Sequence, residues 1–355
     1  MIDLGIKNVW LTLNRQCNLR CYWCYASSLG YLKNDDLPID DAYMVIDMAY
    51  ELGIHGVTLI GGEPTCYPYL IEVVSRCKQK GLISHLVTNG VKLSDKDYTH
   101  QLKEAGLNHV GLSMKGWDKQ SYIDRTKNDE FNQVIKGIEN LSHEEIDFSV
   151  SFVITKDSIN DYIKAIIAAK KAGAYRFGFM FAYDFSNLYK GCKPGKYNFQ
   201  EEIFNFTDSF EKKYDELCNL TDNKMVLMSV FPLCVWSKDF IQKVKNNGHL
   251  ESICQVLRHT GLVLDTNLNV IPCNGMHNVY LGKYGDDFTD AASFSNFWAR
   301  NDVSLFFKRI RNLPSGECNS CDLLDVCGGG CQSNWFNFSY NDLKKALNER
   351  NKKCS

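Results

Sequence analysis

The sequence contains no long hydrophobic run, and this absence excludes a membrane-spanning helix. Its longest apolar stretches, such as AIIAA at 165–169 and MVLMSVF at 225–231, are far shorter than the roughly 20 residues that cross a bilayer. The first ten residues, MIDLGIKNVW, lack the basic, apolar and small-residue segments of a secretion signal. We therefore expect a soluble, cytoplasmic protein that does not enter a membrane.

An excess of charge of one sign is also missing. The 355 residues include 40 Lys and Arg against 42 Asp and Glu, giving a formal net charge of −2. Such a balance provides no general attraction to nucleic acid or to an anionic membrane surface. The apolar share of 45% is ample for a folded core, and the length suits about two domains.

Cysteine, by contrast, is abundant, with 15 in the chain. The odd count, the size of the chain and the missing secretion signal all argue against a disulfide framework. Clustered thiols in a reducing compartment more often bind metals. Four cysteines stand apart from the clusters, and we expect each to be a small buried side chain: Cys66, Cys77, Cys192 and Cys218.

Apolar stretches and amphipathic helical patterns alternate through the first half of the chain. The predicted strands are 9–13, 56–60, 84–88, 109–113, 148–154 and 176–181, and the predicted helices are 40–52, 69–80, 95–105, 130–141 and 160–172. Gly53, Gly81, Gly106 and Gly173 stand where helices should end. Six strands that alternate with helices indicate an α/β fold with a parallel sheet curved into a partial (β/α)6 TIM barrel. Functional groups should lie at the C-terminal ends of its strands.

The pattern changes after residue 183, and we expect three regions. Residues 1–183 form the barrel core, and residues 184–232 form a bridging region with one long helix. Residues 233–355 are rich in cysteine and in loops, which predicts a small second domain.

The stretch LNRQCNLRCYWCYA places Cys17, Cys21 and Cys24 directly after the first predicted strand. Three thiolates in a C-x3-C-x2-C loop can hold three irons of a [4Fe–4S] cluster while the fourth iron has no protein ligand. An open coordination position distinguishes a reactive metal site from a structural one. The alternative is a structural zinc site completed by a distant residue.

This loop resembles the signature of the radical S-adenosylmethionine (SAM) superfamily, in which an aromatic residue, here Trp23, precedes the third cysteine. The segment GGEPT at 61–65 follows the second strand, where the family has a SAM-binding segment. The resemblance implies that the open iron binds SAM and that one electron cleaves SAM to methionine and a 5′-deoxyadenosyl radical. The implied catalytic ligands are Cys17, Cys21 and Cys24, and the implied cofactor-binding residues are Trp23, Gly61, Gly62, Glu63, Pro64, Ser113 and Ser151.

Four further residues bear on the expected SAM site: Gly61, Gly62, Lys115 and Arg125. Gly61 and Gly62 permit close backbone approach, which we expect to bring main-chain groups to the methionine end of SAM. The family commonly has an acidic residue where this chain has Lys115. Arg125 matches an arginine often found after the fourth strand, and a surface ion pair is its alternative explanation.

The C-terminal cysteines resemble a SPASM domain, which holds two auxiliary [4Fe–4S] clusters. The resemblance implies one cluster on Cys318, Cys321, Cys327 and Cys354, and another nearer the barrel on Cys254, Cys273 and Cys331. We expect Cys234 to be the fourth ligand of the nearer cluster, with an open position as the alternative. Where the family has glycine this chain has Leu268, and we expect Asn267 to supply the bend. A zinc ribbon is the alternative for the whole domain.

The resemblance implies a radical SAM oxidoreductase with three [4Fe–4S] clusters that oxidatively modifies a peptide or protein, as in ribosomal peptide maturation. Crosslinks and thioethers are typical products. Alternatives are formylglycine formation in a sulfatase, radical dehydrogenation of a small molecule, and a zinc-binding interaction module without activity. The implied partners are the peptide or protein substrate and an electron donor such as flavodoxin or ferredoxin. Because the first strand begins within ten residues, we expect any leader peptide to be bound either by a separate leader-peptide-binding protein or by the surface of the barrel and the SPASM domain.

Overall fold

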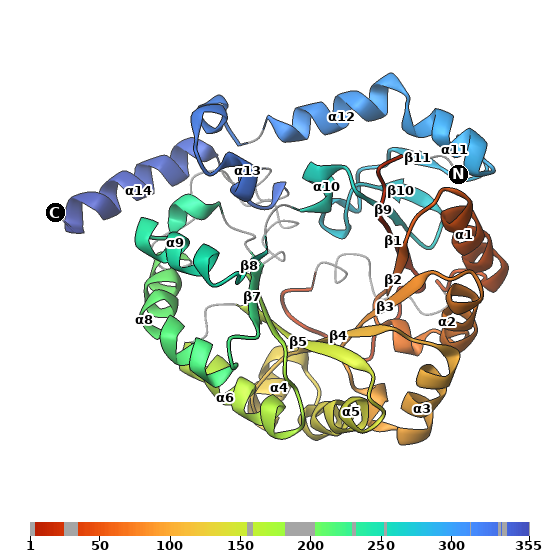
Figure 1. Ribbon diagram of the computed structural model, residues 1–355, viewed down its shortest axis with the longest axis horizontal. Coiled ribbons are helices and arrows are strands. Elements are labelled where there is room, and N and C mark those ends of the chain that lie inside the picture. The colour runs from red at the N-terminus through yellow and green to blue at the C-terminus, as the bar shows by residue number, and fades with distance from the viewer. Residues whose placement is uncertain are drawn as a thin grey trace.

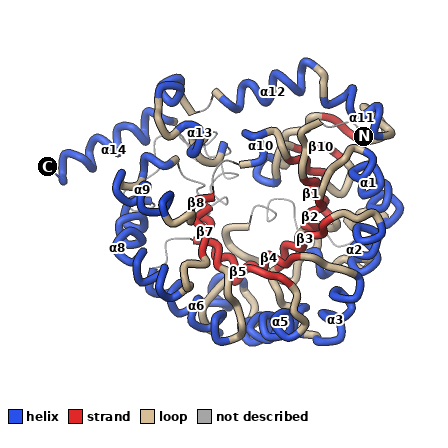
Figure 2. The backbone as a smooth tube through the Cα atoms, in the orientation of Figure 1, coloured by secondary structure: helices blue, strands red, loops and turns tan. Residues whose placement is uncertain are grey.

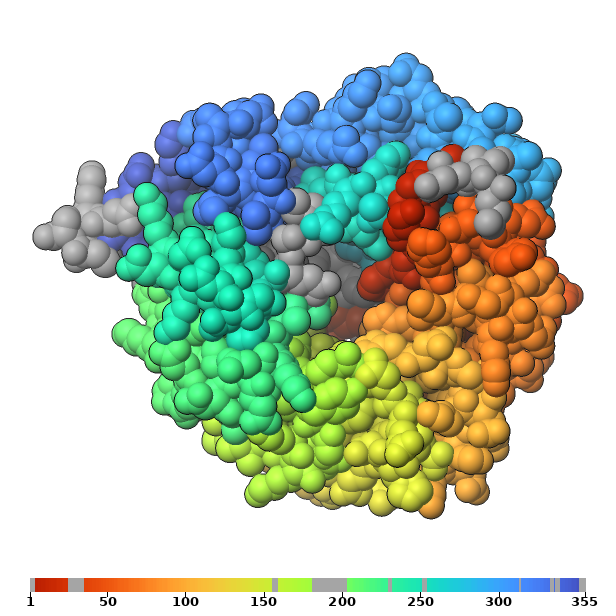
Figure 3. All heavy atoms as spheres, in the orientation of Figure 1, coloured from red at the N-terminus to blue at the C-terminus, as the bar shows by residue number. Residues whose placement is uncertain are grey.

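A computed structural model describes residues 4–24, 35–154, 159–181, 203–228, 232–251, 254–312, 314–332, 335 and 339–354. Over these residues the strands form one curved sheet, and helices cover its outer side (Figures 1 and 2). Figure 3 shows the molecule in the orientation of Figure 1. Its surface is hollowed at the centre, between the red N-terminal residues, the teal residues and the yellow-green residues. Among the described helices, none is both long and apolar enough to cross a membrane.

The six predicted strands are present and parallel. They are β1 (Asn8–Thr12), β2 (Gly56–Ile60), β3 (Ile83–Thr88), β4 (His109–Met114), β5 (Asp147–Ile154) and β6 (Phe177–Phe181), paired in chain order. The α/β partial barrel expected from the alternating pattern is therefore confirmed.

The predicted helices of the barrel are also present, each within two residues of its expected ends. They are α1 (Ile39–Glu51), α2 (Leu70–Gln79), α3 (Lys96–Ala105), α5 (Phe131–His143) and α6 (Ile159–Lys171). All four glycines expected at helix ends have positive φ angles, between 69° and 105°, which is the left-handed conformation that stops a helix.

One helix of the barrel was not predicted. Helix α4 (Lys119–Thr126) follows β4, and Asp118 begins it with a capping box that includes Ser121. The side chain of each of these two residues accepts a hydrogen bond from the backbone of the other. The sequence DKQS at 118–121 shows this signal, but α4 has only eight residues, too few for a clear helical period.

The sheet continues beyond the six predicted strands at both edges. After α8 (Asn205–Leu220), the long helix expected in the bridging region, β7 (Met225–Met228) pairs with β6 and β8 (Leu250–Glu251) pairs with β7, both parallel. At the other edge β9 (Gly261–Leu264) pairs with β1 in parallel, and β10 (Asn269–Ile271) and β11 (Gly282–Lys283) extend it antiparallel.

The described sheet thus has eleven strands in the order β11-β10-β9-β1-β2-β3-β4-β5-β6-β7-β8. It includes strands from all three predicted regions, and the first boundary, at residues 183 and 184, lies outside the described residues. The remaining elements are η2 (Pro64–Cys66), η3 (Lys92–Ser94), η5 (Leu233–Val235), α9 (Lys238–Asn246), α10 (Gln255–Arg258), η6 (Asn274–Met276), α11 (Ala291–Trp298), α12 (Asn301–Arg311), η7 (Gly316–Ser320), α13 (Leu324–Cys327) and α14 (Tyr340–Cys354).

The apolar core is continuous between the barrel and the C-terminal region. Leu11 of β1, Leu264 of β9 and Phe294 of α11 are all fully buried and belong to one packed cluster. This shared core fixes the C-terminal cysteines relative to the end of β1, where the first cysteine loop begins.

Candidate functional site

The first cysteine loop is hydrogen-bonded along its backbone to the segment that follows β2. The amide of Gly62 donates to the carbonyl of Asn14 at 2.9 Å, and the amide of Glu63 donates to the carbonyl of Gln16 at 2.7 Å. The side-chain amide of Asn14 returns a bond to the carbonyl of Glu63 at 2.9 Å. The two motifs recognised in the sequence are therefore one structural unit.

Gly61 and Gly62 are required by this contact between the two segments. A Cβ atom on Gly61 would collide with the side-chain oxygen of Asn14, and one on Gly62 would collide with the backbone carbonyls of Arg15 and Gln16. The close backbone approach that the sequence predicted is thus present, but its partner in this structure is the cysteine loop.

Glu63 is buried, with 2% of its surface exposed, and its carboxylate accepts four hydrogen bonds. Oε1 accepts from the Thr65 amide at 3.1 Å, the Thr65 hydroxyl at 2.7 Å and the Thr88 hydroxyl at 2.5 Å. Oε2 accepts from the Asn89 amide at 2.7 Å. Glu63 therefore joins the segment after β2 to the end of β3, and it precedes Pro64, the first residue of η2.

Three hydrogen bonds, two from asparagine side chains and one between backbone groups, hold the other side of the cysteine loop. The amide nitrogen of Asn89 donates to Oδ1 of Asn18 at 2.7 Å, and that of Asn128 donates to the Asn18 carbonyl at 2.8 Å. The Arg20 amide donates to the carbonyl of Thr126, at the end of α4, at 2.9 Å. These anchors gave no signal in the sequence, because their partners are 71 and 110 residues away.

The three thiols of the loop lie close to one another. Burial raises the pKa of Cys17 to about 12, and the Glu63 carboxylate and the Cys21 and Cys24 thiols contribute to this rise. Burial also raises the pKa of Cys21, and nearby Lys115 opposes that rise. Each of the three thiols is half-buried, and the Leu19 amide donates to Cys17 Sγ at 3.4 Å. Three converging thiols fit the donor set of a [4Fe–4S] cluster with one iron left open.

Trp23 packs inside the barrel wall, whereas Tyr22 is exposed. Trp23 is 5% exposed, and the guanidinium carbon of Arg125 lies 4.8 Å from its ring centre. Arg125 is itself buried and also lies 5.4 Å from the centre of the Trp117 ring. The surface ion pair considered for Arg125 is therefore wrong, because the guanidinium is stacked among aromatic rings beside the cysteine loop.

Ser113 and Ser151 are paired neighbours on β4 and β5. The ammonium of Lys115 donates to Oγ of Ser113 at 2.5 Å, and Oγ of Ser151 donates to the carbonyl of Leu112 at 3.4 Å. Lys115 therefore places a cation between Ser113 and the cysteine loop, at the position where the family has an acidic residue.

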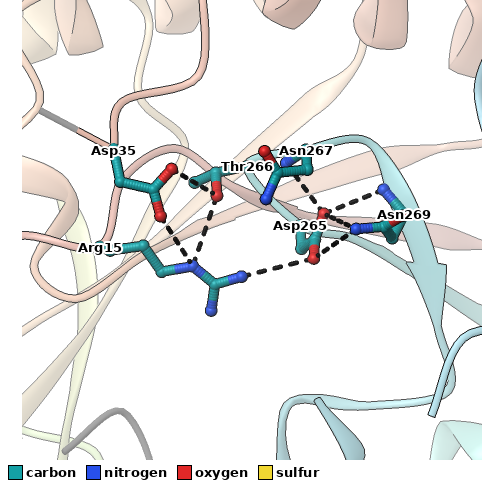
Figure 4. A network of polar contacts seen from close by, with 6 residues as sticks. All are labelled: Arg15, Asp35, Asp265, Thr266, Asn267 and Asn269. Carbon is teal, nitrogen blue, oxygen red and sulfur yellow. Dashed lines mark hydrogen bonds and ion pairs between the residues drawn. The ribbon is translucent and has the colours of Figure 1, made fainter. Parts of the chain in front are cut away.

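Arg15 joins the cysteine loop to the C-terminal region (Figure 4). Its guanidinium donates to Oδ2 of Asp265 at 3.4 Å and to Oγ1 of Thr266 at 3.4 Å, and it lies 3.5 Å from the carboxylate of Asp35. A small pocket adjoins this network. Its lining comes from both regions: Thr12, Asn14, Arg15, Gly61, Gly62, Asp265, Ile271, Asn274 and His277.

Asp265 also shapes the turn between β9 and β10. Its Oδ1 accepts from the amides of Asn267 and Asn269, both at 2.9 Å. Leu268 has a φ angle of +59°, the left-handed conformation that favours glycine. The expected bend at Asn267 is thus at Leu268 itself, the position where the family has glycine.

The C-terminal thiols fall into two groups. Burial raises the pKa of Cys273, and the Cys331 and Cys254 thiols raise it further. Burial likewise raises the pKa of Cys234 to about 12, with Cys327, Cys318 and Cys321 as the thiols that add to the rise. Cys234 therefore lies with the second group, whereas the sequence interpretation placed it with the first.

The other cysteines serve packing where they are described. Cys77 and Cys218 are buried as predicted, and Cys66 is half-buried. Cys192 lies outside the described residues, and the backbone of Cys354 ends α14.

The barrel region is similar in sequence to known proteins. The model of the radical SAM superfamily matches residues 11–169. The Fe-coproporphyrin III synthase of Methanosarcina barkeri is 31% identical over 43% of this chain and 38% of its own length. A probable GTP 3′,8-cyclase of Pyrococcus abyssi is 33% identical over 44% of this chain and 50% of its own length. The chain thus spans half or less of these curated relatives.

Solved structures match over nearly the whole chain. Streptococcus suis SuiB bound to its precursor peptide SuiA has a TM-score of 0.70 at 17% identity, covering 94% of this chain and 73% of SuiB. Native anSMEcpe with bound AdoMet and the Cp18Cys peptide has a TM-score of 0.67 at 19% identity, covering 92% and 89% of the two chains. At these coverages the shared fold includes the cysteine-rich C-terminal region of this chain. Residues 11–169 thus match a radical SAM domain, and the fold of the chain is similar to that of SuiB and anSMEcpe.

Proposed function

We propose that this enzyme cleaves SAM reductively and abstracts a hydrogen atom from a side chain of a peptide or protein, giving an oxidative modification such as a crosslink or thioether. The observation that supports this most is the extent of the fold match. Similarity to the curated relatives spans less than half of this chain, whereas similarity to SuiB and anSMEcpe, both solved with bound peptides, extends over more than nine tenths.

The residues of the barrel fit the binding of the cofactors. Cys17, Cys21 and Cys24 would hold a [4Fe–4S] cluster, and SAM bound at its open iron supplies the 5′-deoxyadenosyl radical when one electron arrives. Glu63 fixes the segment of Gly61 and Gly62 against the cysteine loop. Ser113 and Ser151 are proposed as polar contacts for SAM, and Trp23 packs beneath the loop.

The C-terminal thiols suit the removal of an electron from the substrate, the step that completes such a reaction. Loss of a hydrogen atom leaves a carbon radical on the substrate, and the oxidised product forms only when one further electron and one proton leave. We propose that the two C-terminal thiol groups bind the auxiliary [4Fe–4S] clusters that accept this electron. An electron donor such as flavodoxin or ferredoxin, and a separate leader-binding protein, remain part of the proposal.

Co-expression tests the substrate class. A short peptide encoded beside this enzyme, produced with it anaerobically, is expected to change in mass and to show the modified residue in tandem mass spectrometry. Deuterium on the substrate side chain should appear in 5′-deoxyadenosine, and the variant with Cys17, Cys21 and Cys24 changed to Ala should show neither result. Cleavage of SAM with no deuterium transfer from any peptide would contradict peptide modification while leaving SAM chemistry in place.

A further inference from the structure

Three side chains of β4 and β5 form a continuous chain of hydrogen bonds. Nε2 of His109 lies 3.3 Å from Oγ of Ser149, and Nδ1 of the same ring lies 2.8 Å from Oδ2 of Asp147. Because a carboxylate only accepts hydrogen bonds, Nδ1 of the neutral ring carries the hydrogen and Nε2 is the acceptor. Ser149 therefore donates its hydroxyl hydrogen to His109, and His109 donates to Asp147.

The carboxylate of Asp147 is fixed by two groups that precede β6. The hydroxyl of Tyr175 donates to its Oδ1 at 2.6 Å, and the guanidinium of Arg176 pairs with the same oxygen. Arg176 is the main reason why the pKa of Asp147 is held well below its usual range, and Tyr175 and His109 contribute. Asp147 is therefore charged at neutral pH and is held where it orients the ring of His109.

A second imidazole, that of His85 on β3, lies beside this chain of hydrogen bonds. Its ring is edge-on to the ring of His109, with the ring centres 4.7 Å apart. A Cβ atom on Gly111 would lie 3.0 Å from Nε2 of His85, so glycine at this position lets the ring lie over β4. Since Gly111 pairs with Ser149 on the next strand, Nε2 of His85 is placed beside Ser149.

Nε2 of His85 is buried and has no hydrogen-bond partner among the residues that the structure describes. Burial, with His109 adding to it, lowers the pKa of His85 to about 4, so the ring is neutral at pH 7. Leaving a buried polar atom unpaired is costly, and such an atom in a native fold calls for an explanation. A donor held in place before any ligand binds is what an oxyanion hole requires.

The group lies on the inner face of the barrel, toward the N-terminal ends of its strands. His109 and Ser149 alternate with Val110 and Phe148, which are fully buried in the core beneath the helices. The side chains of His109 and Asp147 are 24% and 47% exposed, so a small molecule can reach them from this end. The cysteine loop follows the C-terminal end of β1, and the group is therefore separate from the candidate SAM site.

We propose that Ser149, His109 and Asp147 form a hydrolytic triad that cleaves small carboxylic esters. Oγ of Ser149 bonds to the ester carbonyl carbon while Nε2 of His109 takes the hydroxyl proton. His85, with its hydrogen on Nε2, donates to the carbonyl oxygen as that oxygen becomes negative. The bond from carbon to the alcohol oxygen then breaks, and His109 returns the proton to the leaving alkoxide.

Water completes the reaction by attacking the acylated Ser149, again with His109 as the base, and the carboxylic acid leaves. The balance is one ester and one water converted to one acid and one alcohol. The ester must be small, because Ser149 is half-buried and both His85 and Val87 lie within 4 Å of the Cβ position of Gly111. The activity needs neither SAM nor an electron and does not rest on the proposed function.

A biotinylated alkyl fluorophosphonate tests the reactivity of Ser149 in the intact, iron-loaded enzyme. The reagent loses fluoride and forms a bond from phosphorus to the oxygen of an activated serine. We expect the adduct on Ser149, located by peptide mass spectrometry, and its loss in His109→Gln. A wild-type enzyme with no adduct on Ser149, or equal labelling in His109→Gln, would overturn the proposal.

Hydrolysis of p-nitrophenyl acetate tests the two groups that contact the ester. Ser149→Ala should remove the part of the rate that the fluorophosphonate blocks, and His85→Leu should lower that part about 100-fold. Ser209→Ala is the control, because this hydroxyl on α8 donates to the backbone carbonyl of Asn205 at 2.8 Å. An unchanged rate in Ser149→Ala or His85→Leu would overturn the role of the residue changed. Circular dichroism and retained iron show that each variant is folded.

Asp147 is a positioning residue, and the pH dependence of the rate tests its role. The rate should fall as the pH falls and His109 takes up a proton. Asp147→Asn removes the charge that stabilises the protonated ring, so the midpoint of the profile should move to lower pH. A lower rate with an unmoved midpoint would show that Asp147 only supports the fold. The titratable and charged groups around His109 are His85 on β3, Asp147 on β5, Tyr175 and Arg176 before β6, and Lys224, which lies 5.7 Å from the Tyr175 ring centre.

Discussion

A Cβ atom placed on Gly61 would lie under 3.0 Å from the side-chain oxygen of Asn14. The same relationship holds at the next residue, where a Cβ atom on Gly62 would collide with the backbone carbonyls of Arg15 and Gln16. The glycines of the segment after β2 are therefore needed to seat the cysteine loop. Any contact they make with SAM is additional to this role.

Gly62→Ala is expected to disturb the iron site more than Gly61→Ala. The methyl group at residue 62 would lie 2.4 and 2.5 Å from two backbone carbonyl oxygens, which cannot rotate away, whereas at residue 61 the nearest atom belongs to a side chain and the nearest backbone oxygen is 2.9 Å away. Overpacking of this kind costs about 1–3 kcal/mol, and we expect Gly62→Ala to retain less iron on the first cysteine loop after reconstitution. Iron analysis checks this, with Gly316→Ala as the control, because nothing lies within 4 Å of its Cβ position. Equal iron retention in all three variants would contradict the role of Gly62.

Glu63→Gln should destabilise the enzyme even when no cofactor is bound. The carboxylate accepts four hydrogen bonds in a buried site, and an amide nitrogen in place of one oxygen would face donors. We expect the free energy of unfolding to fall by about 1–3 kcal/mol, measured by urea denaturation of the apoprotein. Glu317→Gln, an exposed carboxylate paired with Lys344, serves as the control. Unchanged stability in Glu63→Gln would mean that its hydrogen bonds are not structural.

Arg15→Met should loosen the junction between the barrel and the C-terminal region. It removes the cation between Asp35 and the buried Asp265, leaving two carboxylates without their shared partner. We expect a loss of about 1–3 kcal/mol in the free energy of unfolding and faster proteolysis of the β9–β10 turn. Arg300→Met removes an exposed guanidinium paired with Asp287 and Asp302 and should cost under about 1 kcal/mol. Equal losses in the two variants would contradict a special role for Arg15.

His85 should make stability depend on pH between about 4 and 6.5. Burial, with His109 adding to it, lowers the pKa of His85 to about 4, so in this range the unfolded chain binds a proton that the folded chain does not. The contribution is therefore fully present above pH 6.5 and declines as the pH falls, by at most on the order of 3 kcal/mol at pH 4. His85→Leu should flatten this slope in urea denaturation measured from pH 4 to 7.

His100 provides the opposite control. Its partner Glu144 raises the pKa of His100, so its contribution is present below pH 6.5 and declines as the pH rises. His100→Gln should therefore leave the slope due to His85 in place. A pH profile of His85→Leu that matches the wild type would refute the assignment of the slope to His85.

The barrel was predictable because its signals are local. Six apolar stretches alternate with helical patterns, and glycines such as Gly106 stand at the helix ends, so strand and helix positions followed directly. The joining of β9 to β1 was not predictable, because Leu11 and Leu264 pair across more than 250 residues and short strands show little periodicity. The bend at Leu268 was placed one residue too early, because asparagine tolerates positive φ better than leucine.

The site was predictable as a set of residue types and not as a set of contacts. The spacing of Cys17, Cys21 and Cys24 indicated the cluster loop, but the partner of Gly62 and the stacking of Arg125 on Trp23 depend on the folded chain. The grouping of Cys234 is the clearest case. The sequence interpretation assigned Cys234 to the nearer group, whereas the folded chain brings its neighbour Leu233 into contact with Cys327 of the other group.

The most direct test of the account is the anaerobic conversion of SAM by the iron-loaded enzyme in the presence of dithionite. The account predicts formation of 5′-deoxyadenosine and methionine in equal amounts, and no product when Cys17, Cys21 and Cys24 are changed to Ala. An enzyme that carries its full iron content and yields no 5′-deoxyadenosine from SAM would contradict the account at its centre.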